Sequence, residues 1–238
     1  MKRYFFAILL TLLFASPVWG VIAHDASTTQ ASVGSVTTLS WSHTVGSCAE
    51  CLLTVSCGVS GGTTITGITY NSVAMTSYGS IQHSGAANYS ALWRLVAPTA
   101  GANTVDVTLG SAQIVVCVAT SYSGVNQTTP FRGAAVTAEA TGVSSFSQNV
   151  SSASNDLVVD VVTIRDGATA LTVDASQAER GNITDGTTYI KTGASSEAGA
   201  GTVAMSWTSG ANRDWTGVAG SLQPAASARR PIAPIIFQ

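Results

Sequence analysis

Residues 113–130, QIVVCVATSYSGVNQTTP, form the longest strand-like run of the chain after its N-terminal segment. Residues 114–118 of this run are continuously apolar and rich in β-branched side chains, which is typical of a strand buried on both faces. The end of the run, SYSGVNQTTP, contains a glycine, an asparagine and a proline, residue types that end strands and turn the chain. The sequence therefore predicts a buried strand followed by a turn.

Similar short runs recur along the chain, and most alternate between bulky apolar and small polar residues. Residues 157–164, LVVDVVTI, are a second buried run, and Asn71-Ser72 predicts the turn of a hairpin between 65–70 and 73–78. A first strand begins at 21–23, and the remaining predicted strands span 35–45, 52–59, 89–96, 104–109, 134–140, 144–150, 171–178, 188–192, 203–208 and 215–222. Two antiparallel sheets packed face to face are the simplest way to bury so many short strands. The sequence therefore predicts an all-β, two-sheet sandwich.

Several segments resemble a group of secreted and phage-related bacterial domains. The resemblance rests on four segments: VVCVATSYSGVNQTTP at 115–130, ITGITYNSVAMTSYGS at 65–80, YSALWRLVAPTAGANTVDVTL at 89–109 and DWTGVAGSLQPA at 214–225. The first of these contains the pattern SYSGV-x-Q-x-x-P. The resemblance covers residues 23–225. It implies a concanavalin A-like jelly-roll sandwich, and it implies little about activity because most members of the group have none established.

The composition is that of an uncharged, hydroxyl-rich protein. Of 238 residues, 45% are hydrophobic and only 9% are charged, whereas an average soluble protein has about 25% charged residues. A chain of this length and apolar content can bury one sizeable core, so residues 21–225 are expected to form a single domain. The net charge of −2 excludes the basic surface that nucleic-acid binding requires.

The N-terminus has the pattern of a secretory signal peptide. Lys2 and Arg3 precede an apolar run at 4–14, which small residues follow at a plausible cleavage point. We expect a signal peptide at 1–20 with cleavage after Gly20, and Ala23 is the second candidate. The apolar run is shorter than the ~20 residues that span a bilayer, and no later segment could span one as a helix. The mature chain is therefore expected to be secreted or at the cell surface.

Export permits disulfides, and the chain has four cysteines: Cys48, Cys51, Cys57 and Cys117. We expect Cys48 and Cys51 to form a bridge within a loop. The other two lie singly in apolar strands, where they either pair across neighbouring strands or remain buried thiols. A metal site would need a second pair or added histidines, and a redox motif would need a helix after the CxxC, so both are disfavoured.

Two motifs raise the question of an enzyme. Residues 58–62 match G-x-S-x-G, but that nucleophile motif needs a following helix, whereas residues 63–69 are strand-like. A serine hydrolase also needs a histidine as general base, and nothing in the sequence assigns that role to His43 or His83. A glycoside hydrolase would need two carboxylates across one cleft, and its usual E-x-D or E-x-x-x-E spacing is absent. We therefore predict a non-catalytic protein.

Aspartates crowd the second half of the chain: Asp156, Asp160, Asp166, Asp174 and Asp185. Calcium binds where a loop draws several oxygen ligands together. Three of these aspartates lie in turn sequences, where a carboxylate commonly caps backbone N–H groups, and their spacing matches no EF-hand. Two interpretations therefore stay open. The aspartates bind a structural calcium ion, or, more simply, they cap backbone N–H groups in turns.

Aromatic residues could form a platform on which a sugar stacks, although large aromatics are more often part of a core. Trp207, between a serine and a threonine, is the best candidate for an exposed ring. Tyr78 and Tyr89, on either side of the loop at 79–88, come next. These three residues are the predicted ligand-binding residues.

The last residues, 226–238, combine an arginine pair, two prolines and an apolar end. They form either a loose terminus or a segment that adds to a sheet edge of a neighbouring molecule. Together these features predict a secreted binding module for a glycan or another cell-surface polymer. The alternative is a structural subunit of an extracellular or phage-like assembly that associates through this tail.

Overall fold

The computed structural model describes residues 20–85, 88–165, 169–186 and 189–226. The predicted signal peptide, apart from Gly20, and the tail from residue 227 lie outside the described residues. Every regular element in the described ranges is a β-strand, and none of these ranges contains a helix that could cross a membrane.

The strands form three antiparallel sheets. The middle sheet has the order β1 (Ala23–Ala31), β9 (Val115–Ser123), β3 (Leu52–Ser60), β7 (Asn88–Val96) and β6 (Thr76–Gln82). The lower sheet has the order β2 (Val36–Val45), β8 (Gly101–Gln113), β4 (Ile65–Tyr70) and β5 (Val73–Ala74). The upper sheet has the order β10 (Phe131–Ser151), β15 (Thr202–Leu222), β11 (Leu157–Arg165), β14 (Ile190–Ala198) and β13 (Ala178–Thr184), with β12 (Leu171–Val173) paired to β15.

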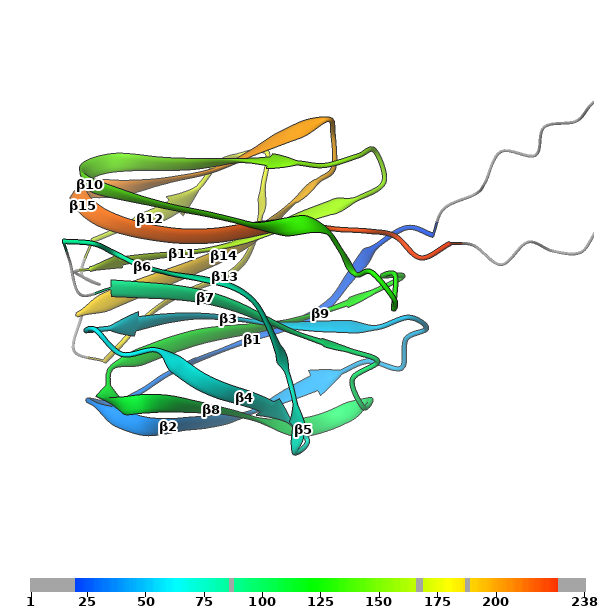
Figure 1. Cartoon of the computed structure of the whole chain (residues 1–238), viewed down its shortest axis with the longest axis horizontal. Coiled ribbons are helices and arrows are strands. Elements are labelled where there is room, and N and C mark those ends of the chain that lie inside the picture. Colours follow the sequence, from blue (N-terminus) through cyan, green and yellow to red (C-terminus); the bar gives the residue numbers. More distant parts are fainter. Residues whose placement is uncertain (1–19, 86–87, 166–168, 187–188, 227–238) are drawn as a thin grey trace, which may run out of the picture.

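Figure 1 shows the three sheets stacked as layers, with the lower sheet at the bottom and β10, β12 and β15 at the top. The all-β class and the antiparallel pairing were predicted correctly. The prediction of two sheets was wrong, because β3 and β9 are buried along nearly their whole length on both faces. A sheet of that kind needs a covering layer on each side.

The two faces of the middle sheet have different chemistry. Toward the lower sheet, side chains such as Val55 and Ala119 pack against Trp41, Ile68 and Val107 in a large apolar core. Toward the upper sheet the contact is partly polar: Leu52 and Leu92 pack there in a second apolar cluster, but other residues of the same face are serine, threonine and glycine. The Ser90 hydroxyl, for example, lies 2.8 Å from Thr163 Oγ1 and 2.9 Å from Thr216 Oγ1.

The upper sheet curls over itself. The pairing of β10 with β15 has three register shifts, and these irregularities bend both long strands. As a result Trp207 of β15 lies over Gly193 of β14, a strand with which β15 does not pair. The interior of this curl is a separate core, in which Phe146 and Trp207 pack with Val162 and Ile164.

Several predicted boundaries differ from the observed strands. The hairpin turn is where it was expected, since Asn71 and Ser72 both have positive φ, but the predicted strand 73–78 is divided between two sheets at Met75. Two pairs of predicted strands are each one continuous strand in the structure. Residues 134–140 and 144–150 both belong to β10, and residues 203–208 and 215–222 both belong to β15. The predicted strand 171–178 ends at Val173, and the strand predicted at 188–192 is β14, Ile190–Ala198. The first strand extends to Ala31.

Both ends of the described chain lie at one end of the stack. The Gly20 N–H donates to the Ala225 carbonyl at 3.1 Å, and the Ala225 N–H donates to the Gly124 carbonyl at 2.8 Å. The chain therefore enters and leaves the stack at the same place (Figure 1).

Candidate functional site

The three predicted ligand-binding aromatics do not form a surface platform. Trp207 is 1% exposed and Tyr89 is 5% exposed, so neither ring face is open to a ligand. The prediction that Trp207 is exposed was wrong because the curl of β15 turns this residue inward. Its indole Nε1–H donates to Asp160 Oδ2 at 2.7 Å. Tyr89 packs in the core between the middle and lower sheets.

Tyr78 is the predicted residue that stays nearest the surface. It lies half-buried on the edge strand β6, and its ring stacks on Phe131 with centroids 3.7 Å apart. Its hydroxyl is buried and has no hydrogen-bond partner in the described part of the chain. Burial raises the pKa of the Tyr78 phenol to about 12. This ring therefore joins the edge of the middle sheet to the first residue of β10.

Arg94 completes this cluster, although it was not among the residues predicted to bind a ligand. Its guanidinium carbon lies 5.6 Å from the Phe131 ring centroid and 6.0 Å from that of Tyr78. Within the described residues this half-buried guanidinium makes no hydrogen bond or ion pair. Its electrostatic contacts there are the cation–π contacts with the two rings. A guanidinium with unused N–H donors suits a planar anionic group such as a carboxylate. We call Tyr78, Arg94 and Phe131 the Arg94 cluster.

The sequence did carry a signal for Arg94. It is the one charged residue in the predicted strand 89–96, YSALWRLV, whose other side chains are mainly apolar. A charge within such a strand is ordinarily paired. In the described structure no acid takes that role.

Two disulfides are present: the expected Cys48–Cys51 loop bridge and, of the two alternatives left open for Cys57 and Cys117, the pair across neighbouring strands. Cys57 and Cys117 are opposite each other on β3 and β9, with Cα atoms 4.1 Å apart, and both are fully buried. Cys48 and Cys51 form the loop bridge between β2 and β3, with Cα atoms 5.7 Å apart. The pairing accounts for all four cysteines as cross-links.

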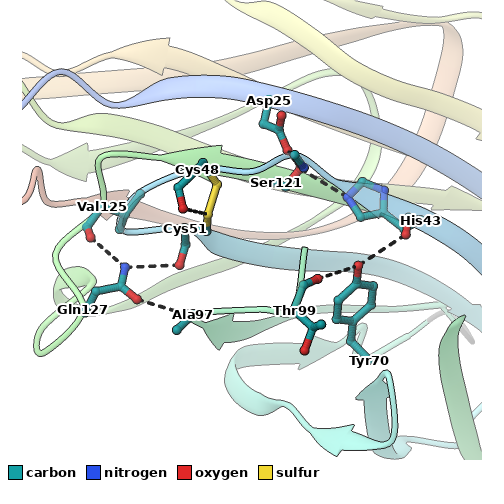
Figure 2. Close-up of a disulfide and its surroundings, with 11 residues drawn as sticks. Asp25, His43, Cys48, Cys51, Tyr70, Ala97, Thr99, Ser121, Val125 and Gln127 are labelled. Atoms are coloured by element: carbon teal, nitrogen blue, oxygen red, sulfur yellow. Dashed lines mark hydrogen bonds between the residues drawn. A yellow bond between two sulfur atoms is a disulfide. The ribbon is translucent and has the colours of Figure 1, made fainter. Parts of the chain in front are cut away.

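Figure 2 shows how the Cys48–Cys51 loop organises one end of the stack. The Cys51 carbonyl accepts hydrogen bonds from the Ala97 N–H at 3.0 Å and from Gln127 Nε2 at 3.1 Å. Gln127 also donates to the Val125 carbonyl at 2.8 Å, and its Oε1 accepts from the Ala97 N–H at 3.0 Å. The glutamine of the SYSGV-x-Q pattern therefore clamps three loops together, which is a structural role.

A chain of hydrogen bonds links β1, β2 and β9 beside this loop (Figure 2). Trp41 Nε1 can only donate, and its acceptor is Thr28 Oγ1 at 3.1 Å. Because the Ser121 hydroxyl gives its single proton to Asp25, His43 Nε2–H donates to Ser121 Oγ at 3.3 Å, and Nδ1 of the neutral imidazole accepts from the Thr28 hydroxyl at 2.9 Å. The Ser121 hydroxyl donates to Asp25 Oδ2 at 2.7 Å. Burial lowers the pKa of His43 to about 4, which agrees with a neutral imidazole in this chain.

This chain contains serine, histidine and aspartate, but its connectivity differs from that of a hydrolase triad. The carboxylate of Asp25 accepts from the serine, whereas a triad carboxylate holds the imidazole. Ser121 and His43 are both 0% exposed, so a substrate cannot reach the hydroxyl. The G-x-S-x-G serine, Ser60, is also buried, and its hydroxyl donates to Gln113 Oε1 at 3.3 Å.

The aspartates considered for calcium are spread over separate local networks. Asp156 accepts two hydrogen bonds from Arg132, at 2.6 and 3.0 Å, and Asp174 accepts from Ser176. Asp185 accepts backbone N–H groups of Tyr189 and Ile190. Asp166 lies outside the described residues. Among those described, no group of three or more metal-ligating side chains occurs. A calcium site stays a prediction.

A cavity of about 260 Å³ lies where the chain enters the stack, lined by Val21, Ile22, Asn155, Asp156, Leu157, Ala198 and Gly199. This volume is below the ~300 Å³ at which small-molecule sites usually begin. The carboxylate of Asp156 is already used by Arg132. The Arg94 cluster is therefore the better candidate for a ligand site.

The chain matches no family model, no curated protein and no solved structure.

Proposed function

We propose that the protein is an exported, non-catalytic recognition module that binds an acidic carbohydrate polymer at the Arg94 cluster. The observation that carries this proposal is the half-buried Arg94 guanidinium, which lies over two aromatic rings without an acidic partner in the described structure. A carboxylate or sulfate group on a sugar would supply the missing acceptor. The N-terminal segment and the two disulfides support export.

The proposal assigns different tasks to the members of the cluster. Arg94 provides charge and directional N–H donors, and a desolvated cation beside aromatic rings gains more from an anion than a fully hydrated one does. Phe131 and Tyr78 hold the guanidinium in place by packing. The finer expectation of a concanavalin A-like jelly roll stays a prediction.

A glycan and polysaccharide array tests this function. We expect the chain from Val21 onward to bind uronic-acid or sulfated polymers and to ignore their neutral counterparts. Arg94→Ala should abolish that binding. Arg165→Ala is the matched control, because Arg165 also lies over a tyrosine ring, 4.9 Å from the Tyr189 centroid. Parallel arrays with calcium and with a chelator test the predicted ion. An array on which acidic polymers give no signal would overturn the proposal.

The second candidate is a structural subunit of an extracellular or phage-like assembly. It is favoured by the outer face of β2, where the exposed side chains Thr38, Ser40, Ser42 and Thr44 are all uncharged hydroxyls. The strand itself carries no exposed charge, and Asp106 of the neighbouring strand β8 is hydrogen-bonded to Ser40, so like-charge repulsion opposes stacking of copies only weakly. Sedimentation of the full chain and of a chain ending at Ala226 decides it. This function requires assemblies that shrink when residues 227–238 are removed, and monomers in both samples would exclude it.

A further inference from the structure

The interior of the curled upper sheet holds a polar cluster that the proposed function does not use. Asp160 and Ser195 are each 1% exposed, and Gln177 is 7% exposed. Asp160 lies on β11, Ser195 on the neighbouring strand β14, and Gln177 in the turn before β13. A carboxylate, a hydroxyl and a carboxamide are thus enclosed together away from water.

The hydroxyl and the carboxylate are arranged as a nucleophile and its base. The Ser195 hydroxyl donates to Asp160 Oδ1 at 2.6 Å, and the Ser195 N–H donates to the same oxygen at 2.9 Å. Trp207 Nε1–H holds the other oxygen at 2.7 Å. Burial raises the pKa of Asp160 to about 6. A carboxyl group with a pKa near neutral can both accept a proton and return it.

The carboxamide of Gln177 lies against the same hydroxyl. Its Nε2–H donates to Ser195 Oγ at 2.6 Å, and its Oε1 accepts the backbone N–H of Ser206 at 2.6 Å. The Ser206 N–H fixes which end of the amide is oxygen, because an NH₂ group could not accept this bond. An N–H aimed at the amide oxygen is also the donor that stabilises the oxyanion formed when a hydroxyl adds to an amide.

The turn that carries Gln177 is held rigidly. The Asp174 N–H donates to the Ser206 carbonyl at 3.0 Å, and the Gln177 N–H donates to the Asp174 carbonyl at 3.1 Å. Ser206 therefore holds the turn with its carbonyl and the carboxamide with its N–H. A fixed approach of hydroxyl to amide supplies much of what an intramolecular reaction needs.

We propose that Ser195 and Gln177 join in an intramolecular ester, formed by the folded chain itself with Asp160 as the proton-transferring group. The Asp160 carboxylate takes the proton of the Ser195 hydroxyl, and Oγ attacks the carboxamide carbon of Gln177. The resulting oxyanion is stabilised by the Ser206 N–H.

The protonated Asp160 then gives its proton to Nε2, the carbon–nitrogen bond breaks, and ammonia leaves. One C–O bond and one N–H bond form while one O–H bond and one C–N bond break. The reaction needs no oxidant, reductant or cofactor. Its product is a covalent link between β14 and the turn that precedes β13.

The intact mass of the purified full chain, measured after incubation at neutral pH, tests the cross-link. We expect a mass lower than that of the disulfide-bonded chain by one ammonia. Proteolysis should yield one branched product joining the peptides of Gln177 and Ser195, and mild hydroxylamine should separate them. Gln148 is the internal control, because it is 3% exposed but donates to the Gly217 carbonyl and has no serine or threonine hydroxyl bonded to its amide.

Two variants check the assigned roles. Ser195→Ala should have the mass calculated for its sequence without loss of ammonia. Asp160→Asn should lose ammonia more slowly, so that most of its molecules are still unreacted when the unaltered chain has reacted. Loss of ammonia at an unchanged rate in Asp160→Asn would remove Asp160 from the reaction. If either variant fails to fold, the peptide analysis of the unaltered chain still tests the cross-link. Recovery of its two peptides as separate, unmodified species overturns the proposal.

Discussion

At the scale of single residues, His43 is a buried titratable group whose protonation opposes folding. Its folded pKa of about 4 lies below the ordinary value of 6.5 because burial disfavours the imidazolium. Between these two values the unfolded chain binds the proton and the folded chain does not. The stabilisation by neutral His43 is therefore present above pH 6.5 and is lost as the pH falls toward 4.

His43→Gln removes this titration. Relative to the variant, the unaltered protein should lose about 3 kcal/mol of unfolding free energy between pH 6.5 and pH 4. Urea unfolding of both proteins at a series of pH values measures the difference. Parallel pH profiles for the two proteins would contradict the assignment of a neutral, buried imidazole.

The sequence identified some residue environments and missed others. The CxxC spacing favoured the Cys48–Cys51 loop bridge, whereas the apolar strands around Cys57 and Cys117 left a cross-strand disulfide and two buried thiols as alternatives. The burial of Trp207 could not be predicted from its neighbours Ser206 and Thr208, because it follows from the bend of β15. Arg94 was overlooked although a single charge among apolar strand residues is unusual.

At the scale of strands, Gly58 sets how closely β3 approaches the upper sheet. A Cβ atom at this position would come within overlap distance of Thr192 Oγ1 and Thr163 Oγ1. Thr163 also bonds Ser90, so a displacement would disturb the hydroxyl network between the two sheets.

Gly58→Ala should therefore lower the free energy of unfolding by about 1–3 kcal/mol, which is typical of an overpacked core. Gly62→Ala is the control, because a Cβ atom at Gly62 would meet no other atom within 4 Å and the φ of this residue is not positive. Chemical denaturation of both variants measures the contrast. Equal stability of the two would show that the sheets can separate without cost.

Strand positions were predictable from alternation, but their continuity was not. Residues 134–140 and 144–150 look like two strands because the intervening residues 141–143, TGV, interrupt the pattern. In the structure Gly142 has a φ of 65° and lies at a register shift, so the strand bends there and continues. An interruption of the alternation shows only that the following side chains point to the other face. A β-bulge has this effect without ending the strand.

At the scale of the whole molecule, the two disulfides lie in very different surroundings. Cys57 and Cys117 are enclosed between two sheets, whereas Cys48 is part-exposed in a loop at the end of the stack. Thiol–disulfide exchange needs access of the attacking thiolate to the bridge.

A dithiol under native conditions should therefore reduce Cys48–Cys51 first. Alkylation followed by peptide mass spectrometry should label these two cysteines while the buried pair stays protected until denaturant is added. Labelling of all four cysteines at one rate would mean that reduction proceeds only through global unfolding.

The number of layers was in principle visible in the sequence. Residues 114–118 were predicted as a strand buried on both faces, and a two-sheet sandwich covers only one face of each strand. Strands buried on both faces therefore imply a third layer. The resemblance to a jelly-roll group favoured two sheets instead.

The most direct test of the proposed function observes Arg94 itself. In a ¹⁵N-labelled protein, the Nε–Hε signal of Arg94 should shift on addition of a uronic-acid oligosaccharide, and that of Arg165 should not. A neutral oligosaccharide of equal length should move neither signal. If the acidic sugar leaves the Arg94 signal unchanged, or if it moves both arginine signals equally, the Arg94 cluster is not the binding site.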